Sequence, residues 1–249
     1  MSDGESISMS TMLTPDITTE RLLLRPFRET DAPAEFRAAQ DPRIGALCGW
    51  RPPESVEESL ETIRTVFAQP WTWAITLRQA VKLPDSILAD NPQFAQLRDV
   101  PRQRFSVFGE PVETVEPEGD GHTVIIPADE PIGAISLQSS IGLTDKDGKP
   151  LDLSTHDQAL GYWVAAPLWR NGIATEASQA LLKFAFTHTQ ISTIWGRFKL
   201  GNAGSQGVMR KIGMSEYGED HHHWMPLIDE YWDEKIYSIT RQEWEEQQK

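Results

Sequence analysis

Residues 168–177 constrain this chain more than any other stretch. They read Leu-Trp-Arg-Asn-Gly-Ile-Ala-Thr-Glu-Ala and lie between an apolar, strand-like run at 159–166 and a helix-like run at 176–186. A strand that passes through a glycine-containing turn into a helix leaves backbone N–H groups unpaired at the helix N-terminus. Those groups and the helix dipole favour an anion, most often a phosphate. The sequence therefore predicts a phosphate-binding turn, in which Gly172 lets the backbone approach the ligand without a Cβ in the way.

What the turn lacks narrows the choice of phosphate ligand. It is too short for a nucleotide P-loop, which needs Gly-x-x-x-x-Gly-Lys-Ser/Thr. It also lacks the three glycines of a dinucleotide-binding fingerprint. Gly172 and Ala174 alone also fit an ordinary strand-to-helix turn, in which the glycine serves only the backbone geometry.

Four segments in a fixed order carry a resemblance to a known family. Residues 169–174, Trp-Arg-Asn-Gly-Ile-Ala, resemble the pyrophosphate loop of the GNAT acetyltransferases, whose pattern is Gln/Arg-x-x-Gly-x-Gly/Ala. Trp169 departs from the first position, and this departure is typical of the branch that resembles ribosomal-protein N-terminal acetyltransferases. The other segments that fit that branch are Thr-Glu-Arg-Leu-Leu-Leu-Arg-Pro at 19–26, Asn-Ala-Gly-Ser with Val-Met-Arg-Lys-Ile-Gly-Met at 202–214, and Ser-Ile-Thr-Arg-Gln-Glu-Trp at 238–244.

The resemblance implies a fold and a domain plan. It implies an α/β (α+β) GNAT fold, with a central, mixed, mostly antiparallel twisted sheet that splays at the CoA site and is flanked by helices. We expect a flexible lead at 1–16 and one acetyltransferase domain at 17–245. An atypical insert at 79–129 departs from the family pattern, and we expect a short helix at 91–97 and a strand at 122–126 within it. The insert serves as a lid or partner surface, or is a tolerated surface insertion.

Hydrophobic periodicity and turn residues predict the remaining elements. Asp41-Pro42 is expected to end the first helix, and Ser55 with Glu58 has the spacing of a capping box at the start of the second. A polar turn is expected at 145–150. Strands are predicted at 22–24, 71–77, 132–139, 159–166, 191–198 and 235–240, and helices at 30–40, 55–69, 176–186 and 202–212.

Charge and cysteine content exclude several classes of protein. The net charge of −14 opposes nucleic-acid binding, which favours a basic surface. No apolar run approaches the roughly 20 residues of a membrane span, and the polar N-terminus is not a secretory signal. The single cysteine, Cys48, rules out an internal disulfide and suits a reducing compartment. We therefore expect a cytoplasmic protein with no nucleic-acid or membrane partner, present as a monomer or homodimer.

The resemblance also implies the chemistry. Acetyl-CoA is the expected donor, and the acceptor is a primary amine of a protein N-terminus or a small molecule. A backbone N–H of the strand before the loop, from Val164 or its neighbour, would bind the oxyanion. The cofactor is expected to contact Trp163, Val164, Ala165, Arg170, Asn171, Gly172, Ile173, Ala174, Thr175, Asn202 and Ser205, and Ser205, Asn202 and Val164 are the expected catalytic residues.

Several of these residues have a second interpretation. Asn202 binds the CoA arm or caps its helix, and it can do both. Ser205 protonates the leaving thiolate or is small because CoA packs closely. The side chains of Tyr162 and Trp163 are interpreted as core packing. Many GNAT enzymes place a tyrosine acid four residues beyond Ser205, but this chain has Met209 there, and a thioether cannot donate a proton.

No general base and no metal site are evident. Glu176 follows the loop, although an acidic residue in a first helical turn also serves the helix dipole. Asp157 and His156 are equally plausible, and a water chain to solvent is sufficient. The histidines at 221–223 point in diverging directions if they lie on a strand, so we expect no metal. The alternative function is a weakly catalytic GNAT-fold protein that binds CoA as a sensor or serves in protein interaction.

Overall fold

An eight-stranded sheet organises the chain. The computed structural model describes residues 14–97, 102–105, 111–115, 123–139, 149, 153–154 and 156–249. Neighbouring strands of the sheet are antiparallel except β9 and β10, which are parallel. This mixed, mostly antiparallel sheet confirms the predicted fold class. The strand order is β1 (Ile17–Thr18), β2 (Leu22–Arg25), β3 (Thr72–Leu77), β8 (Pro131–Ser139), β9 (Asp157–Val164), β10 (Thr193–Lys199), β12 (Glu230–Thr240) and β11 (Ser215–Met225).

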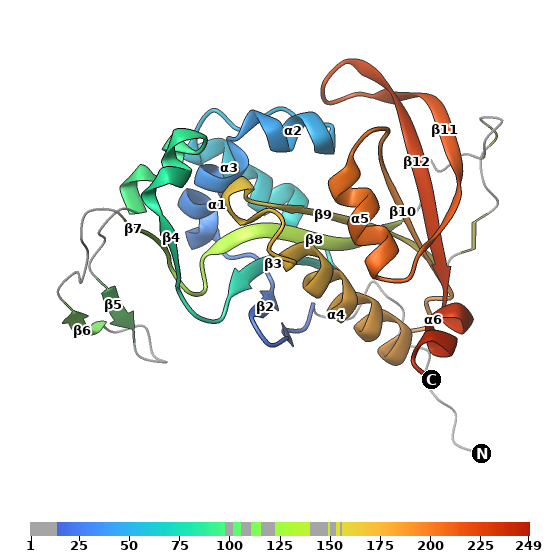
Figure 1. Cartoon of the computed structure of the whole chain (residues 1–249), viewed down its shortest axis with the longest axis horizontal. Coiled ribbons are helices and arrows are strands. Elements are labelled where there is room, and N and C mark those ends of the chain that lie inside the picture. Colours follow the sequence, from blue (N-terminus) through green and yellow to red (C-terminus); the bar gives the residue numbers. More distant parts are fainter. Residues whose placement is uncertain are drawn as a thin grey trace.

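Helices cover both faces of this sheet (Figure 1). Three helices lie on one side: α1 (Ala32–Ala39), α2 (Pro42–Cys48) and α3 (Val56–Thr62). Two lie on the other side: α4 (Ile173–His188) contacts β1, β2 and β9, and α5 (Ala203–Lys211) packs on β10 beside α4. The last helix, α6 (Arg241–Gln247), follows β12. Short turns η2 (Glu29–Asp31), η3 (Ile63–Phe67) and η6 (Ala166–Leu168) complete this part of the chain. No helix among the described residues is long and apolar enough to cross a membrane.

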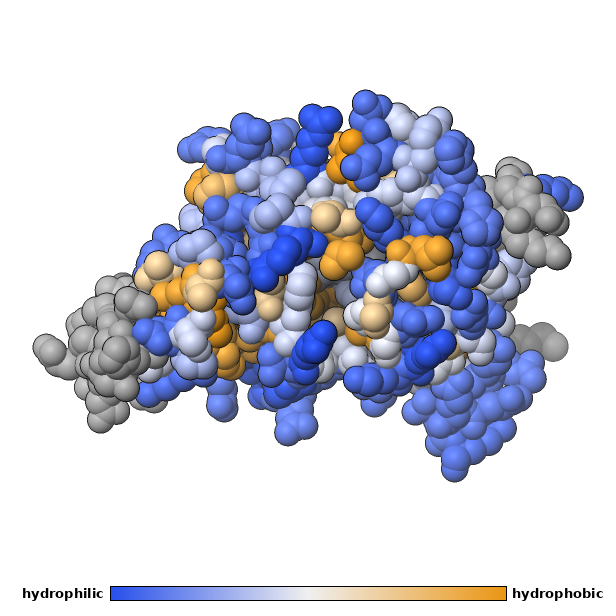
Figure 2. All heavy atoms as spheres, turned by 45° about the horizontal axis from the view of Figure 1, so that its top comes forward, coloured by the Kyte–Doolittle hydropathy of each residue, from blue (hydrophilic) through white to orange (hydrophobic). Residues whose placement is uncertain are grey.

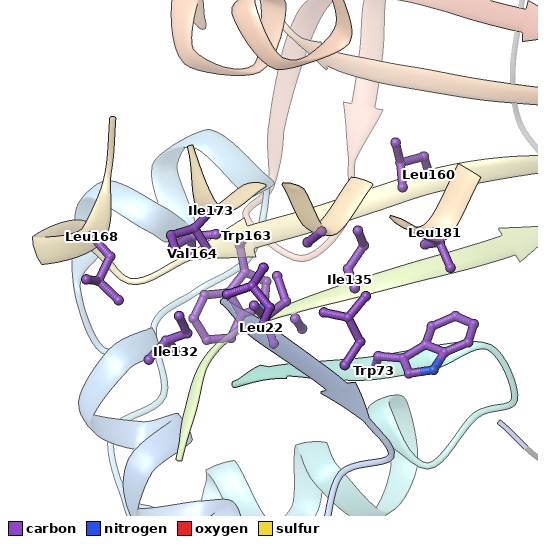
Figure 3. Packing of buried hydrophobic residues seen from close by; sticks show 14 of the residues in the cluster. Leu22, Trp73, Ile132, Ile135, Leu160, Trp163, Val164, Leu168, Ile173 and Leu181 are labelled. Atoms are coloured by element: carbon purple, nitrogen blue, oxygen red, sulfur yellow. The ribbon is translucent and has the colours of Figure 1, made fainter. Parts of the chain in front are cut away.

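The core lies between the sheet and these helices. All six residues of β3 are buried, because helices cover both faces of the sheet at this strand. The rings of Trp71 and Trp73 pack against Phe184 of α4, with centroids 5.7 and 6.0 Å away. Trp73 also donates its indole N–H to the backbone oxygen of Pro15 at 2.7 Å, so the end of the predicted lead is bound to the core. Figure 3 shows Trp73 among the buried side chains of β2, β8 and α4.

Part of the insert at 79–129 lies within the described residues. Strand β4 (Val81–Pro84) pairs with β7 (Thr123–Ile126), and β5 (Arg102–Phe105) pairs with β6 (Pro111–Val115). The short turn η4 (Asp85–Ala89) leads to η5 (Pro92–Leu97). The predicted helix at 91–97 is confirmed in position but is a 3₁₀ helix. The predicted strand at 122–126 is confirmed over 123–126. Asn91 does not cap η5 with its side chain, because that side chain accepts from Arg43 at 2.6 Å and donates to the Ile87 carbonyl at 2.8 Å.

Besides β1, β5, β6, α6 and the short η segments, three longer-range features of the fold were not predicted from the sequence pattern. Strand β4 is one, and β11 at the edge of the sheet is another. Helix α2 is the third: Asp41 ends α1 but also caps α2, since its carboxylate accepts from the Arg43 backbone N–H at 2.9 Å. At α3 only half of the predicted capping box forms: Ser55 accepts from the backbone of Glu58.

Two predicted segments lie largely outside the described residues. They are the lead at 1–16, of which residues 14–16 are described, and the turn at 145–150, of which residue 149 is described. Figure 2 shows that most of the visible surface is hydrophilic, in keeping with the net charge of −14.

Candidate active site

Strands β9 and β10 part in the middle of the sheet. They pair from Asp157 with Thr193 as far as Leu160 with Gly196. Beyond that pair, which we call the apex, β9 continues along β8 and β10 continues along β12. The facing edges of the two strands therefore separate, and a ligand with amide groups can pair with the edge of β9 as a peptide would.

The directions of the backbone N–H and C=O groups along β9 show which of them face the gap. The Ala165 N–H donates to the Ile132 carbonyl of β8 at 2.7 Å. Because consecutive N–H groups of a strand point to opposite sides, the Val164 N–H points away from β8, toward the gap. The Val164 carbonyl points to the same side, where it accepts the indole N–H of Trp169 at 2.6 Å. The Val164 N–H is therefore placed to donate to a ligand in the gap.

The turn into α4 leaves the helix N-terminus open. Gly172 is the N-cap residue, with φ +77°, and forms no side-chain cap. Arg170 also has a left-handed φ of +63°. The Asn171 side chain turns back to the Trp169 carbonyl at 3.1 Å, and Arg21 donates to the Asn171 carbonyl at 2.9 Å. These bonds fix the turn while the first N–H groups of α4 stay available to an anion. Figure 3 shows Val164 and Ile173 side by side where β9 gives way to this turn.

Asn202 caps α5 at the opposite wall of the gap. Its Oδ1 accepts from the Ser205 backbone N–H at 3.1 Å, so the capping role is present. Among the described residues no hydrogen bond engages its Nδ2 or the Ser205 hydroxyl, so both stay available to a ligand.

These elements enclose one cavity of about 610 Å³. Most of the predicted cofactor residues line it. Ala165 and Asn171 do not line it, because Ala165 is fully buried and the Asn171 side chain bends back onto the turn. The predicted residues that line it are Trp163, Val164, Arg170, Gly172, Ile173, Ala174, Thr175, Asn202 and Ser205.

The charges around the cavity are all positive. Arg170 and Lys211 line it, and no acidic side chain among the described residues does. Neither cation has an ion-pair partner in the described part of the chain. Arg210, the neighbour of Lys211 in sequence, does not line the cavity. A chain with a net charge of −14 thus keeps a local site for an anion.

Sequence reasoning missed part of this wall. Ile44, Leu47 and Cys48 come from α2, which was not predicted. Tyr162 packs against the core, as interpreted from the sequence, and it also lines the cavity. Three glycines of the α5 region also face it, at 201, 204 and 207. Their spacing of three residues was a readable signal, since it places small residues on one face of a helix.

The sequence profile of the acetyltransferase (GNAT) domain matches residues 21–96 and 101–215. The chain belongs to the GNAT acetyltransferase family. This is a family of acyltransferases, and its profile extends over most of the insert at 79–129 as well as the two flanking segments.

Relatives and solved structures agree with this family. The uncharacterized N-acetyltransferase YnaD of Bacillus subtilis is 37% identical over 90 residues, which are 36% of this chain and 52% of the relative. The chain thus spans about half the length of the curated relatives that it matches.

An acetyltransferase of the GNAT family from Bacillus anthracis has a TM-score of 0.59 at 19% identity, covering 92% of this chain and 99% of that one. RimL, a ribosomal L7/L12 α-N-protein acetyltransferase solved with coenzyme A, has a TM-score of 0.56 at 14% identity, covering 91% and 98%. At these identities the likeness concerns the fold.

The candidate bases of this GNAT chain lie away from the cavity. Burial alone would raise the pKa of Glu176, but hydrogen bonds from Thr19 and Arg21 outweigh it and hold the pKa below its ordinary value. Glu176 therefore ties α4 to the β1–β2 segment and is a poor base. Asp157 accepts from Ser154 and Ser192 at the far end of β9, and His156 precedes it there. Neither lines the cavity.

The three histidines have separate surroundings, as the diverging directions predicted. His221 lies 3.5 Å from both Glu219 and Asp233, and His222 stacks on Tyr231 with centroids 3.9 Å apart. His223 belongs to a different group, formed with Asp220, Glu234 and Arg197, which we call the outer cluster.

The outer cluster is the one set among the described residues whose carboxylate and imidazole atoms could converge on an ion, since they lie within 4.8 Å of one another. Arg197 approaches His223 Nε2 at 2.6 Å, and an arginine only donates. Nε2 of His223 is then the acceptor, so Nδ1 carries the proton and faces Asp220 at 3.2 Å. A neutral imidazole has one such lone pair, and Arg197 uses it. That leaves His223 no lone pair for a metal, whereas one carboxylate oxygen each of Asp220 and Glu234 has no hydrogen-bond partner among the described residues. The absence of a metal stays a prediction.

Proposed function

We propose that this chain is an N-acetyltransferase that moves the acetyl group of acetyl-CoA to a primary amine. The observation that carries the proposal is the single cavity that joins the exposed edge of β9, the open N-terminus of α4 and the cap of α5. The only charged side chains that line it among the described residues are cations, and its open backbone N–H groups suit a pyrophosphate with an amide-bearing arm.

In this proposal each part of the cofactor has a partner. The pyrophosphate binds the backbone of 172–175 at the N-terminus of α4, with Arg170 and Lys211 as counter-charges. The pantetheine arm runs along the edge of β9 toward the apex. Asn202 donates its Nδ2 to the arm while its Oδ1 caps α5. The cofactor is acetyl-CoA with no metal.

Catalysis follows from the same geometry. A neutral amine attacks the thioester carbonyl, and the Val164 N–H donates to the oxyanion that forms. No carboxylate or imidazole among the described residues lines the cavity, so water carries the amine proton to solvent. Ser205, with a free hydroxyl on the cavity wall, donates to the cofactor near its sulfur.

For the acceptor we propose a protein N-terminus ahead of a small-molecule amine. RimL acts on an α-amino group of a ribosomal protein, and its fold covers 91% of this chain. The net charge of −14 also concentrates cationic acceptors near the surface. We propose a cytoplasmic location and a monomer or homodimer, as the sequence suggested.

Calorimetric titration with acetyl-CoA, followed by thiol release with peptide and polyamine panels, tests the function. We expect binding, and release with peptides that carry a free N-terminus. Acetylated peptides of the same sequence are the matched control and should give no release. Absence of acetyl-CoA binding would overturn the proposal.

A second function, a CoA sensor without turnover, is favoured by one observation. Met209 holds the position of the usual tyrosine acid and is buried against Gly196, where a Cβ would lie 2.6 Å from its Cε. Tight binding without release from any amine would support the sensor.

A further inference from the structure

Arg43, in the first turn of α2, joins the insert at 79–129 to the turn that leads into α4. Its guanidinium donates to the Asp90 backbone carbonyl at 2.9 Å and to the Asn91 side-chain oxygen at 2.6 Å, and both acceptors belong to the insert. The face of the same guanidinium lies over the indole of Trp169, with Cζ 5.6 Å from the ring centroid. One side chain therefore connects a segment outside the cavity to a residue that lines it.

The Arg43 guanidinium is held along its edge. Its Nε donates to Asp41 Oδ1 at 2.9 Å, and the Asp41 side chain is itself buried. The Asn91 side chain that accepts from Arg43 is fixed in turn, because its Nδ2 donates to the Ile87 carbonyl at 2.8 Å. A guanidinium is planar, so hydrogen bonds along its edge set the direction of its face. Arg43 thus presents a face of fixed direction to the Trp169 ring.

The part of the insert that contacts Arg43 is packed on the core. Phe94 and Leu97 of η5 are 3% and 6% exposed, and both belong to the main hydrophobic cluster. Moving this part of the insert away from the core would expose those apolar side chains to water, which is unfavourable. The segment at 90–97 is therefore a support for Arg43 and not a loosely attached loop.

Trp169 connects this support to the end of β9. Its indole N–H donates to the Val164 carbonyl at 2.6 Å, and the N–H of the same peptide group, from Ala165, donates to the Ile132 carbonyl at 2.7 Å. The peptide group after Val164 is thus held from both sides. Trp169 is 38% exposed, so without Arg43 over its face the indole gains room to turn away from the Val164 carbonyl. The direction of the Val164 N–H is then less fixed, because the two groups belong to one residue.

We propose that the insert positions the Val164 N–H for the thioester oxygen, through Arg43 and Trp169. This inference rests on the proposed acetyl transfer. Asn91, Arg43 and Trp169, which we call the relay, are positioning residues in this proposal, because they act on the direction of the N–H and do not touch the reacting atoms. Neither Asn91 nor Arg43 lines the cavity, so their effect on a bound thioester passes through Trp169.

The preference for acetyl-CoA over CoA tests the relay without any acceptor. Only acetyl-CoA has a carbonyl oxygen for the Val164 N–H, so its affinity divided by that of CoA, both from calorimetry, reports on that contact. Arg43→Lys keeps the charge but loses the planar fork, and Asn91→Ala removes the support from the insert. Each should lower the ratio about threefold and leave the affinity for CoA within about twofold, because a hydrogen bond is weakened. Arg64→Lys, the same change at an exposed arginine paired with Glu29, should match wild type.

A double-mutant cycle with Trp169→Leu separates the relay from independent effects. In the Trp169→Leu background, Arg43→Lys should leave the ratio unchanged, because the indole that Arg43 supports is absent. Effects of the two substitutions that multiply would overturn the relay. Equal ratios in wild type, Arg43→Lys and Asn91→Ala would also overturn it and would leave acetyl transfer standing. Failure of wild type to bind either ligand would instead remove the proposed function, and the relay with it.

Discussion

Two regions of the molecule differ in whether their polar groups have partners within the protein. One is the cavity between β9 and α5, and the other is the outer cluster around Arg197 of β10. In the cavity, Gly172 leaves the helix N-terminus uncapped by any side chain, and Arg170 and Lys211 have no ion-pair partner in the described part of the chain. In the outer cluster, Arg197 faces Glu234 and His223, and His223 faces Asp220. The donors of the cavity have no protein partner among the described residues, whereas the charged groups of the outer cluster face one another. Open donors around a cavity indicate a ligand site, whereas convergent but closed charges indicate structure.

The largest effect is expected at Gly172. Gly172→Val should weaken CoA binding at least 100-fold by calorimetry, because the side chain blocks the backbone that the phosphate approaches. The left-handed φ of +77° adds a cost of about 1–2 kcal/mol in stability. The matched control is Gly213→Val, at φ +85° outside the cavity. It should lose stability and keep its affinity for CoA. Unchanged affinity in Gly172→Val would refute the placement of the phosphate.

Removal of Arg197 should lower the stability of the fold and leave the affinity for CoA unchanged. Arg197→Leu leaves the buried carboxylate of Glu234 without its cation, which costs about 3 kcal/mol in the free energy of unfolding. Arg64→Leu, which removes a solvent-exposed pair with Glu29, should leave the free energy of unfolding nearly unchanged. Both are measured by denaturant unfolding with CoA titration. A large loss of CoA affinity in Arg197→Leu would show that the cluster belongs to the cofactor site.

A third kind of polar group, Glu35 of α1, is buried with no cation partner. Burial raises its pKa from 4.5 to about 7, although the nearby Ser59 hydroxyl opposes the rise. A raised carboxyl pKa means that the folded state holds the proton, so the stability contribution is present below pH 4.5 and is lost as pH rises through about 7. Glu35→Gln should therefore gain about 2 kcal/mol over wild type between pH 5 and pH 8. Parallel pH profiles of the two proteins in denaturant unfolding would contradict a buried, unpaired Glu35.

The smallest effect separates two neighbouring cations. Lys211→Gln should lower CoA affinity about fivefold to tenfold, with a weaker dependence on salt, because Lys211 lines the cavity. Arg210→Gln is the control with the same charge change outside the cavity and should alter affinity less than about twofold. Equal losses of CoA affinity in the two variants would mean that the overall electrostatic field of the surface, and not the contact of Lys211 with the cavity, sets the affinity.

Local patterns predicted the cofactor half of the fold well. The glycine turn between a strand and a helix is readable because its chemistry is contained in ten neighbouring residues, 168–177. Asn202 was readable for the same reason, and the structure shows that its Oδ1 caps α5.

The missed features depend on distant residues. Asp41 follows the end of α1 and caps α2. In the sequence, Asp41-Pro42 was interpreted only as the end of the first helix. Strand β11 lies at the sheet edge, where most of its side chains are exposed, so it carries no apolar alternation. The place of Tyr162 on the cavity wall was missed because it depends on the departure of β10 from β9 beyond Leu160, which no local pattern shows.

The central claim is that the open donors of the cavity hold acetyl-CoA, and a crystal structure of the complex tests it most directly. We predict the pyrophosphate at the N-terminus of α4 beside Gly172, and the acetyl oxygen within hydrogen-bond distance of the Val164 N–H. A cofactor bound elsewhere, or with its arm away from the β9 edge, would contradict the account.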